Sequence, residues 1–197
     1  MPNETLEEAM DRYARGEDDA LASVYDLSVR GLLSFLVRMT RSRSLAEDLA
    51  HETFLRVHGA RATYRTGARV MPWMFAIARR LFLDDVRRHR REGPSLDAPA
   101  ADGERRSDPG VASTEPAADD LVAAQELSTE IEAILVRIPE TQATAFRLLK
   151  QEDLSVAEAA AVLGTTEGTV KLRAHRAYEA LRKALGPRLV DEGASFA

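Results

Sequence analysis

The segment Leu154–Leu185, LSVAEAAAVLGTTEGTVKLRAHRAYEALRKAL, has the pattern of two helices joined by a tight turn. Gly164 suits the left-handed cap that ends a helix, and either Thr165 or Thr166 can cap the helix that follows. Apolar side chains recur in the second helix at helical spacing and predict a buried stripe. The segment therefore predicts a helix-turn-helix. The stripe consists of Val170, Ala174, Ala177, Leu181 and Leu185.

The other side of the second helix is polar and basic. Thr169, Lys171, Arg173 and Arg176 lie outside the apolar stripe, and His175 is a further candidate beside them. A recognition helix reads base edges mainly from its N-terminal part, while neighbouring basic residues hold phosphates. This pattern favours DNA binding.

Charge is strongly segregated along the 197 residues, although the net charge is only −5. Ser28–Met71, Pro72–Glu92 and Gly164–Leu189 carry +5, +3 and +4, whereas Met1–Leu27 and Gly93–Glu126 each carry −6. Binding to a polyanion depends on local patches more than on net charge. The basic segments therefore remain candidates for nucleic-acid contacts in an acidic protein.

An acidic segment separates two helical regions. Residues 93–120 are rich in Pro, Ala, Gly, Ser and Asp and contain almost no large apolar side chains. Such a composition cannot bury enough surface to offset ordering entropy and predicts a flexible linker. We therefore predict an all-α protein with small domains at 1–92 and 121–197. Helices are expected over Leu6–Arg15, Asp18–Thr40, Leu45–Arg61, Pro72–Arg91, Leu121–Arg137, Glu140–Gln151, Val156–Leu163 and Glu167–Leu185.

The segment Pro72–Arg91, PWMFAIARRLFLDDVRRHRR, contains six arginines beside one tryptophan. Helical spacing separates a core side from a cationic side that includes Trp73. Arginines can pair with phosphates and an aromatic ring can stack on a base. Equally, Trp73 can be a core residue beside a solvated basic face. The predicted core side holds Met74, Phe75, Ala78, Phe82 and Val86, and the cationic side Arg79, Arg80, Arg87, Arg90 and Arg91.

In the predicted Leu45 helix, Ser44 and Glu47 have the spacing of a capping box. Asp48, Glu52 and Leu55 share one side of this helix. Two acids and a leucine together suit docking on a basic, partly apolar partner helix. An ordinary exposed helix face is the alternative interpretation.

Several functional classes lack support in the sequence. The chain has no cysteine, which excludes disulfides and thiolate metal sites and favours a reducing cytoplasm. His51 and His58 lie two helical turns apart, about 10 Å, too far to share one zinc ion. The acidic start is unlike a secretion signal, and no run approaches the ~20 apolar residues of a membrane span. We expect no metal, no cofactor and no enzymatic activity, since no nucleophile–base pair or phosphate loop appears.

At four segments the sequence resembles the extracytoplasmic-function (group IV) sigma factors of bacterial RNA polymerase. The resemblance runs in the family's order over roughly 18–91 and 121–185. It departs from the family pattern at His51, Arg80 and Leu172. The segments are AEDLAHETFLRVH (Ala46–His58), PWMFAIARRLFLDDVRRHRR (Pro72–Arg91), IPETQATAFRLL (Ile138–Leu149) and DLSVAEAAAVLGTTEGTVKLRAHRAYEALRKAL (Asp153–Leu185).

The resemblance implies a role for each domain. The first domain is expected to bind the β′ clamp of core polymerase through Asp48, Glu52 and Leu55, and to open the −10 promoter element. The second domain is expected to bind the β flap and to read the −35 element. The −10 candidates are Tyr64, Arg65, Thr66, Trp73, Arg79, Arg80, Arg87 and Arg88. The −35 candidates are Thr166, Glu167, Thr169, Lys171, Arg173, His175 and Arg176.

Two further expectations follow from the resemblance. The acidic linker resembles the segment that threads through the RNA-exit region of polymerase, and an anti-sigma factor is an expected regulator. The alternative function is a helix-turn-helix transcriptional regulator without a sigma role. That alternative explains Leu154–Leu185 equally well, but it does not explain Trp73 with its arginines or the acidic stripe at Asp48.

Overall fold

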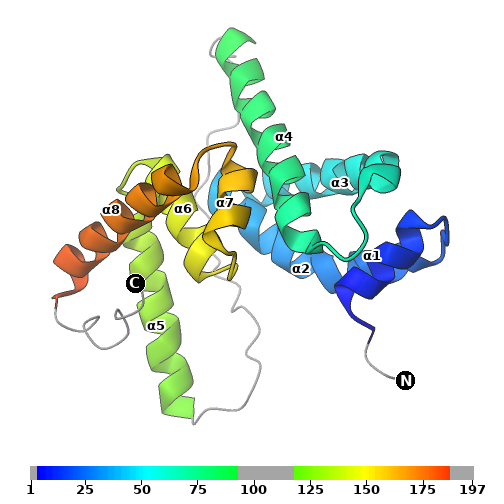
Figure 1. The fold of residues 1–197 in the computed structure, drawn as a ribbon. Coiled ribbons are helices and arrows are strands. Elements are labelled where there is room, and N and C mark those ends of the chain that lie inside the picture. Colours follow the sequence, from blue (N-terminus) through cyan, green and yellow to red (C-terminus); the bar gives the residue numbers. More distant parts are fainter. Residues whose placement is uncertain (1–3, 93–117, 187–197) are drawn as a thin grey trace. The chain divides into compact units, whose positions relative to one another are not determined.

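The computed structural model describes residues 4–92 and 118–186, and within them all regular structure is helical (Figure 1). This confirms the predicted all-α fold. Each predicted helix is present, with ends shifted by a few residues at most. The elements are α1 (Leu6–Ala14), α2 (Ala20–Thr40), α3 (Arg43–Ala60), the short 3₁₀ helix η1 (Arg61–Thr63), α4 (Val70–Glu92), α5 (Ala118–Leu135), α6 (Glu140–Lys150), α7 (Val156–Leu163) and α8 (Glu167–Leu185).

The chain divides into two compact units by its own contacts. The first contains α1–α4 and takes in Ala157–Thr165, and the second contains α5, α6 and α8. The domain boundaries predicted at 92 and 121 stay a prediction, and α5 begins slightly earlier, at Ala118. Apart from that helix start, the predicted linker lies outside the described residues.

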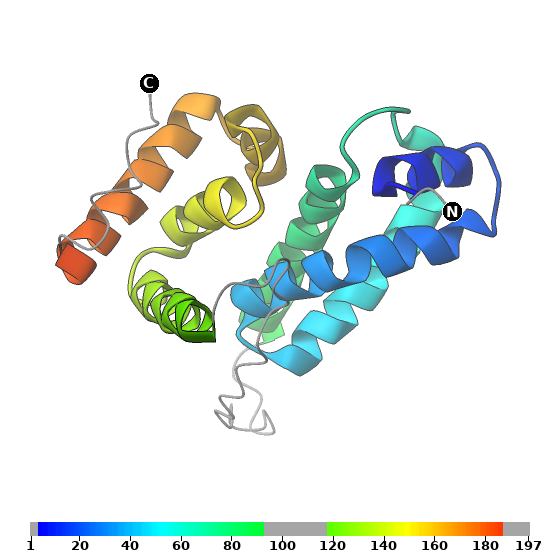
Figure 2. The same ribbon diagram turned by 90° about the horizontal axis from the view of Figure 1, so that it is seen from below.

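Helices α2, α3 and α4 pack against one another and form the centre of the first unit, as both ribbon views show (Figures 1 and 2). Phe35 of α2 and Phe75 of α4 meet there with ring centroids 4.4 Å apart. Both side chains are almost fully buried, together with Leu32, Leu36 and Met74. Removing such large apolar surfaces from water is the main stabilising contribution to a small helical unit.

Helix α2 corrects one expectation from the sequence. By length and apolar composition alone, Ala20–Thr40 is sufficient to cross a membrane. In the described structure it serves instead as the core helix of the first unit, with Val24, Leu32, Phe35 and Leu36 buried. A third of its apolar stretch is buried, along one side of the helix, whereas Tyr25 and Leu27 are exposed.

Helix α1 is capped at its start by Thr5 and Glu8. The Glu8 N–H donates to Thr5 Oγ1 at 3.2 Å, and the Thr5 N–H donates to Glu8 Oε2 at 2.8 Å. The Thr5 hydroxyl also donates to Glu8 Oε2 at 2.9 Å, and the bonds from the Thr5 N–H and hydroxyl lower the pKa of the Glu8 carboxyl. The capping box satisfies backbone donors that a helix start otherwise leaves unpaired.

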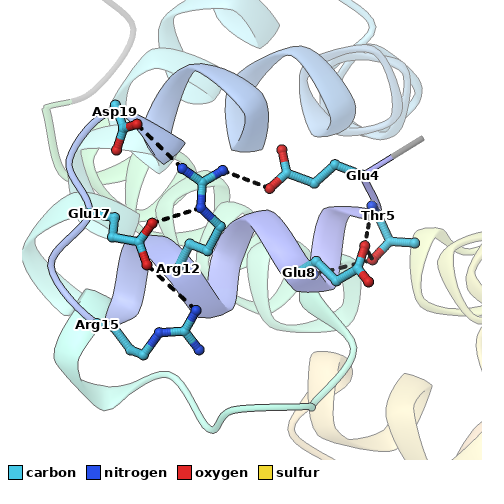
Figure 3. Close-up of polar contacts among 7 residues, drawn as sticks. All are labelled: Glu4, Thr5, Glu8, Arg12, Arg15, Glu17 and Asp19. Atoms are coloured by element: carbon cyan, nitrogen blue, oxygen red, sulfur yellow. Dashed lines mark hydrogen bonds and ion pairs between the residues drawn. The ribbon is translucent and has the colours of Figure 1, made fainter. Parts of the chain in front are cut away.

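Arg12 ties α1 to the start of α2 (Figure 3). Its guanidinium donates to Glu17 and Glu4, each at 2.8 Å, and to Asp19 at 3.3 Å. The bonds to Glu17 and Glu4 raise the pKa of Arg12, and the same contact lowers the pKa of Glu17. Because Asp19 directly precedes α2, one side chain joins three segments near the N-terminus.

Helix α3 begins before the predicted position, and the expected cap is wrong. Ser42, with an extended backbone, is the N-cap, and its side chain accepts a hydrogen bond from the Leu45 N–H at 3.3 Å. Ser44 lies inside the first turn. Glu47, expected to complete the capping box, accepts instead from Arg43 Nε at 2.9 Å. Two serines at nearby positions made both starts compatible with the sequence.

The two serines give a direct test of this correction. Ser42→Ala should lower the free energy of unfolding by about 1 kcal/mol, because it removes the side-chain acceptor of the N-cap. Ser44→Ala should change it by less than about 0.5 kcal/mol, as expected for an exposed position. Urea unfolding followed by the fluorescence of Trp73 measures both. A larger loss of stability for Ser44→Ala than for Ser42→Ala would show that Ser44 caps the helix, as the sequence predicted.

The second unit has its own apolar core. Leu135, Ala143, Ala177, Leu181 and Leu185 are buried together and draw on α5, α6 and α8. All the residues predicted for the stripe of α8 are buried, which confirms the face of this helix that turns inward. The partly buried side chains around the core are Ile131, Ile134, Ile138 and Phe146.

An ion pair between a buried arginine and a half-buried glutamate accompanies this core. Arg147 of α6 is 2% exposed and its Nη2 donates to Glu132 Oε2 of α5 at 2.8 Å. Gln151 Nε2 donates to the other oxygen of Glu132 at 2.8 Å. Glu132 therefore compensates a charge that has been removed from water.

The turn between α7 and α8 has the predicted features. Gly164 has φ of 61°, in the left-handed region, and follows the last residue of α7. Of the two candidate caps, Thr166 is the N-cap of α8, and its side chain accepts from the Thr169 N–H at 3.3 Å. Two helices joined by a three-residue turn are thus present where the helix-turn-helix was predicted.

Candidate nucleic-acid and partner-binding surfaces

The predicted stripe on α3 is accessible to a partner. Asp48 is exposed and Leu55 is 53% exposed, an unusual position for a leucine. Glu52 is half-buried and accepts a hydrogen bond from Arg56 at 2.8 Å. We call Asp48, Glu52 and Leu55 the α3 stripe. It combines negative charge with an apolar side chain that no core residue covers.

A groove of about 950 Å³ lies between α2 and α3 and shares Leu55 with the α3 stripe. Tyr25 and Phe54 line it, with ring centroids 4.8 Å apart. Its lining also includes His51, one of the positions that departs from the family pattern. Acidic side chains complete the lining, and three of them are paired with arginines: Asp18 with Arg61, Asp19 with Arg12 and Glu47 with Arg43. The acidic lining residues are Asp18, Asp19, Asp26 and Glu47.

Sequence reasoning missed the α2 side of this groove. Tyr25 is 47% exposed, although it belongs to an otherwise apolar helix. The only signal in the sequence was a tyrosine that directly precedes the charged residue Asp26. In the sequence alone, that aromatic reads as one more core residue.

The loop from Tyr64 to Arg69 precedes α4 and contains three of the predicted −10 residues. Arg65 and Thr66 are exposed, whereas Tyr64 is only 8% exposed. The Tyr64 ring lies 5.5 Å from that of Trp73, and its hydroxyl donates to the carbonyl of Ala68. Burial, with a smaller contribution from Asp11 and Glu7, raises the pKa of Tyr64 to about 12. Tyr64 therefore supports the loop from inside, and its direct contact with DNA stays a prediction.

Two carboxylates of α1 reach this loop, which the sequence analysis did not anticipate. The Gly67 N–H donates to Asp11 Oδ1 at 3.1 Å, and the Val70 N–H donates to Glu7 Oε1 at 3.2 Å. The available signal was weak, since two acids four residues apart on a helix are usually a solvated face. Only the folded chain brings α1 beside a loop more than fifty residues away.

Helix α4 has the predicted amphipathic character. Met74, Phe75 and Ala78 are buried, and Phe82 and Val86 are half-buried. Of the predicted −10 residues on α4, Arg80, Arg87 and Arg88 are exposed, whereas Arg79 and Trp73 are half-buried.

Two of these arginines have acidic neighbours on the same helix. Arg87 pairs with Asp84 at 3.0 Å, and Arg88 lies 3.8 Å from Asp85. The Arg87–Asp84 pair is exposed, and such a pair contributes at most about 1 kcal/mol and can be exchanged for a phosphate contact.

Helix α8 presents the predicted basic surface. Lys171, His175 and Arg176 are exposed, together with Thr166 and Glu167 at its start. Thr169 and Arg173 are half-buried beside them. Leu172, which replaces the usual polar residue of the family pattern, is 50% exposed on the same helix. The N-terminal half of α8 thus offers hydrogen-bond donors, cations and one apolar side chain to a partner.

Comparisons with known proteins match both halves of the chain. The family model for sigma-70 region 2 matches residues 24–92, and that for sigma-70 region 4 matches residues 128–181. The RNA polymerase sigma factor CarQ of Myxococcus xanthus is 34% identical over 90% of this chain and 95% of its own length. The ECF RNA polymerase sigma factor SigW of Bacillus subtilis is 30% identical over 87% and 91%.

Solved structures share the fold. The sigma factor RpoE of Bartonella quintana, solved with the anti-sigma factor NepR, matches with a TM-score of 0.63 and 23% identity over 85% of this chain and 97% of that one. CnrH, solved with the cytosolic domain of CnrY, matches with a TM-score of 0.61 and 19% identity over 91% and 96%.

Proposed function

Because the chain belongs to the extracytoplasmic-function group of sigma-70 factors, and is thus an RNA polymerase sigma factor for promoter-specific initiation, we propose that three of its surfaces divide this work. The α3 stripe and the adjoining groove bind core polymerase. The loop at Arg65 and the cationic side of α4 bind the −10 element. The basic surface of α8 reads the −35 element.

The family match over 24–92 is the observation that carries the sigma role. A regulator with only a helix-turn-helix needs no counterpart to that region, and the comparisons give the alternative no support. The proposed role is one of binding, with the chemistry of RNA synthesis left to the polymerase. A cytoplasmic location follows from the role, because polymerase and chromosome are there.

The polymerase surface combines two features that suit a basic, partly apolar helix. The exposed Leu55 and the rings of Tyr25 and Phe54 offer apolar contact. The acids around them favour a cationic partner and oppose an acidic one. We assign this partner to the β′ clamp of the polymerase and the partner of the second unit to its β flap, as the family resemblance implies.

The −10 surface combines cations with an aromatic pair. The exposed arginines of α4 can hold phosphates, while Trp73, packed on Tyr64, lies beside the loop that carries Arg65 and Thr66. Opening DNA costs about 1.4 kcal/mol per base-pair step. Stacking on aromatic side chains returns ~1–3 kcal/mol per base. Because the two magnitudes are close, the free protein should open DNA poorly and need contacts from polymerase.

An anti-sigma factor is the proposed regulator. The solved relatives RpoE and CnrH were captured with NepR and with the cytosolic domain of CnrY, respectively, and the first of these partners is named an anti-sigma factor. A regulator that covers the α3 stripe would block polymerase binding directly. The carboxylates of Asp26 in the groove and of Asp48 in the α3 stripe favour a regulator that presents a basic surface.

Run-off transcription tests the proposed function. The protein is mixed with core RNA polymerase and a library of promoter fragments, and the transcripts are sequenced. We expect start sites that share two motifs about one and a half to two DNA turns apart, at ~10.5 bp per turn. Transcripts that do not depend on the protein, combined with specific duplex binding by the protein alone, would favour the regulator instead.

Arg176→Ala tests the −35 surface. Arg176 is exposed and lies in the N-terminal half of α8. If it contacts a phosphate, its loss should reduce the slope of log K against log salt by about 0.9 for the isolated −35 duplex. Lys183→Ala removes the same charge from the far end of α8 and should leave the slope unchanged. Equal slopes for both variants and the wild type would exclude this contact.

A further inference from the structure

We propose that Glu7 and Asp11 of α1 are positioning residues for the loop that receives a base of the −10 element. The inference rests on the proposed function of that loop, which consists of residues 64–69 and follows η1. It assigns to α1 a part in promoter opening without any contact between α1 and DNA.

The two carboxylates bind the end of the loop at adjacent points. Asp11 Oδ1 accepts from the Gly67 N–H at 3.1 Å, and Glu7 Oε1 accepts from the Val70 N–H at 3.2 Å. Val70 is the first residue of α4, so Glu7 satisfies a backbone donor that this helix start leaves unpaired. A carboxylate at a helix start is also favoured by the helix dipole.

One backbone hydrogen bond to η1 and one within the loop define the shape of the loop. The Tyr64 N–H donates to the Arg61 carbonyl at 3.2 Å, and the Ala68 N–H donates to the Arg65 carbonyl at 3.0 Å. Gly67 has φ of 77°, a left-handed conformation that favours glycine. These bonds form the turn that exposes Arg65 and Thr66, and the carboxylates of α1 attach this turn to the rest of the unit.

Helix α1 is a firm support for such an attachment. Ala9, Met10 and Tyr13 are fully buried, and Arg12 joins α1 to the start of α2. Glu7 and Asp11 lie four residues apart and therefore on one side of the helix. One side of α1 is thus fixed in the core while another holds the loop.

Negative charge behind the loop also suits a base-receiving site. Asp11 and Glu7 are half-buried and close enough to Tyr64 to contribute to its raised pKa. Carboxylates at this place oppose a phosphate and do not oppose an uncharged base. The exposed arginines of α4 then remain the surface for the DNA backbone.

The test uses holoenzyme assembled from the full chain and core polymerase, with the promoter recovered by run-off transcription. Binding is measured to single-stranded oligonucleotides of the non-template −10 strand, each with one abasic position. Wild-type holoenzyme should show a position at which the missing base weakens binding. Asp11→Ala should weaken binding of the intact strand about tenfold and remove the penalty at that position, because it eliminates a charged hydrogen-bond acceptor.

Three further variants distinguish positioning from a general loss of structure. Asp11→Asn should keep most of the binding, because its amide oxygen can still accept from Gly67. Glu7→Ala should weaken the intact strand in the same direction and gives an independent result if Asp11→Ala does not fold. Glu130→Ala, at an exposed position of α5, is the control for charge loss. Affinity for core polymerase and for the −35 duplex should stay unchanged in all four variants.

Two negative results have different meanings. If wild-type holoenzyme shows no sensitive position, the proposed base-receiving function of the loop is wrong. If the wild type shows a sensitive position, and Asp11→Ala and Glu7→Ala keep both that position and the wild-type affinity, the loop functions without α1. The positioning role is then excluded.

Discussion

Glu132→Ala should lower the free energy of unfolding of the second unit by about 3–5 kcal/mol. Its partner Arg147 is 2% exposed, and the distance between Arg147 Nη2 and Glu132 Oε2 is 2.8 Å. Removal of the carboxylate leaves a buried guanidinium without its counter-charge, and the cost of that desolvation is no longer compensated. Because a small unit has little stability to lose, part of the second unit should unfold near room temperature.

Two optical signals can measure this effect separately in each unit. Trp73 is the single tryptophan of the chain and belongs to the first unit, whereas circular dichroism reports helices of both. In urea, Glu132→Ala should shift the second-unit part of the dichroism transition and leave the fluorescence transition in place. Equal shifts of both signals would show that the units unfold together, contrary to the expectation from their separate cores.

Matched variants identify the cause. Glu130→Ala removes an exposed carboxylate from the same helix and should change stability by less than about 0.5 kcal/mol. The double variant Glu132→Ala with Arg147→Met should recover much of the loss, because an apolar side chain of similar length replaces the buried charge. A double variant as unstable as Glu132→Ala alone would attribute the loss to packing.

Leu55→Ala should weaken binding to core RNA polymerase about 30-fold. Leu55 is 53% exposed and lies where the α3 stripe meets the groove, a central position on the proposed surface. Truncation of a central anchor typically costs at least about 2 kcal/mol of binding free energy. Because the side chain is exposed in the free protein, the free energy of unfolding should hardly change.

Leu27→Ala is the matched control for this prediction. Leu27 belongs to the same unit and is 48% exposed, and it is absent from the lining of the groove. The substitution removes the same atoms from a similarly exposed place. Competition binding with labelled core polymerase measures both variants. If both variants bind core polymerase with equal affinity, the groove is not part of the polymerase interface.

The sequence predicted best what depends on local pattern. The helices follow from apolar periodicity, and the buried stripe of α8 is present residue by residue because its spacing admits one inward face. Gly164 and Thr166 were identifiable because a left-handed backbone and a helix start each demand particular side chains. The start of α3 was not predictable in the same way, because Ser42 and Ser44 can both cap a helix. The choice between them depends on whether the Glu47 side chain bonds to the cap or, as observed, to Arg43.

Contacts between distant segments were not predictable from pattern. Nothing in the local sequence of α1 distinguishes Asp11 from a solvated acid, and its partner Gly67 is brought to it by the packing of the whole unit. The burial of Tyr64 has the same origin, because a tyrosine in a basic loop is usually exposed. The groove depends on Tyr25 and Phe54, from two different helices, meeting in space.

The arrangement around Arg12 makes the N-terminal region unequally tolerant of mutation. Each of Glu4, Glu17 and Asp19 supplies one contact, so a neutral replacement of any one leaves the other two in place (Figure 3). Loss of Arg12 is different in kind, because it leaves three carboxylates near one another with only Arg15, 3.6 Å from Glu17, as a neighbouring cation. Substitutions of a single acid should therefore be common among homologues of this sequence. A neutral residue at position 12 should be found only where some of the three acids have also been replaced.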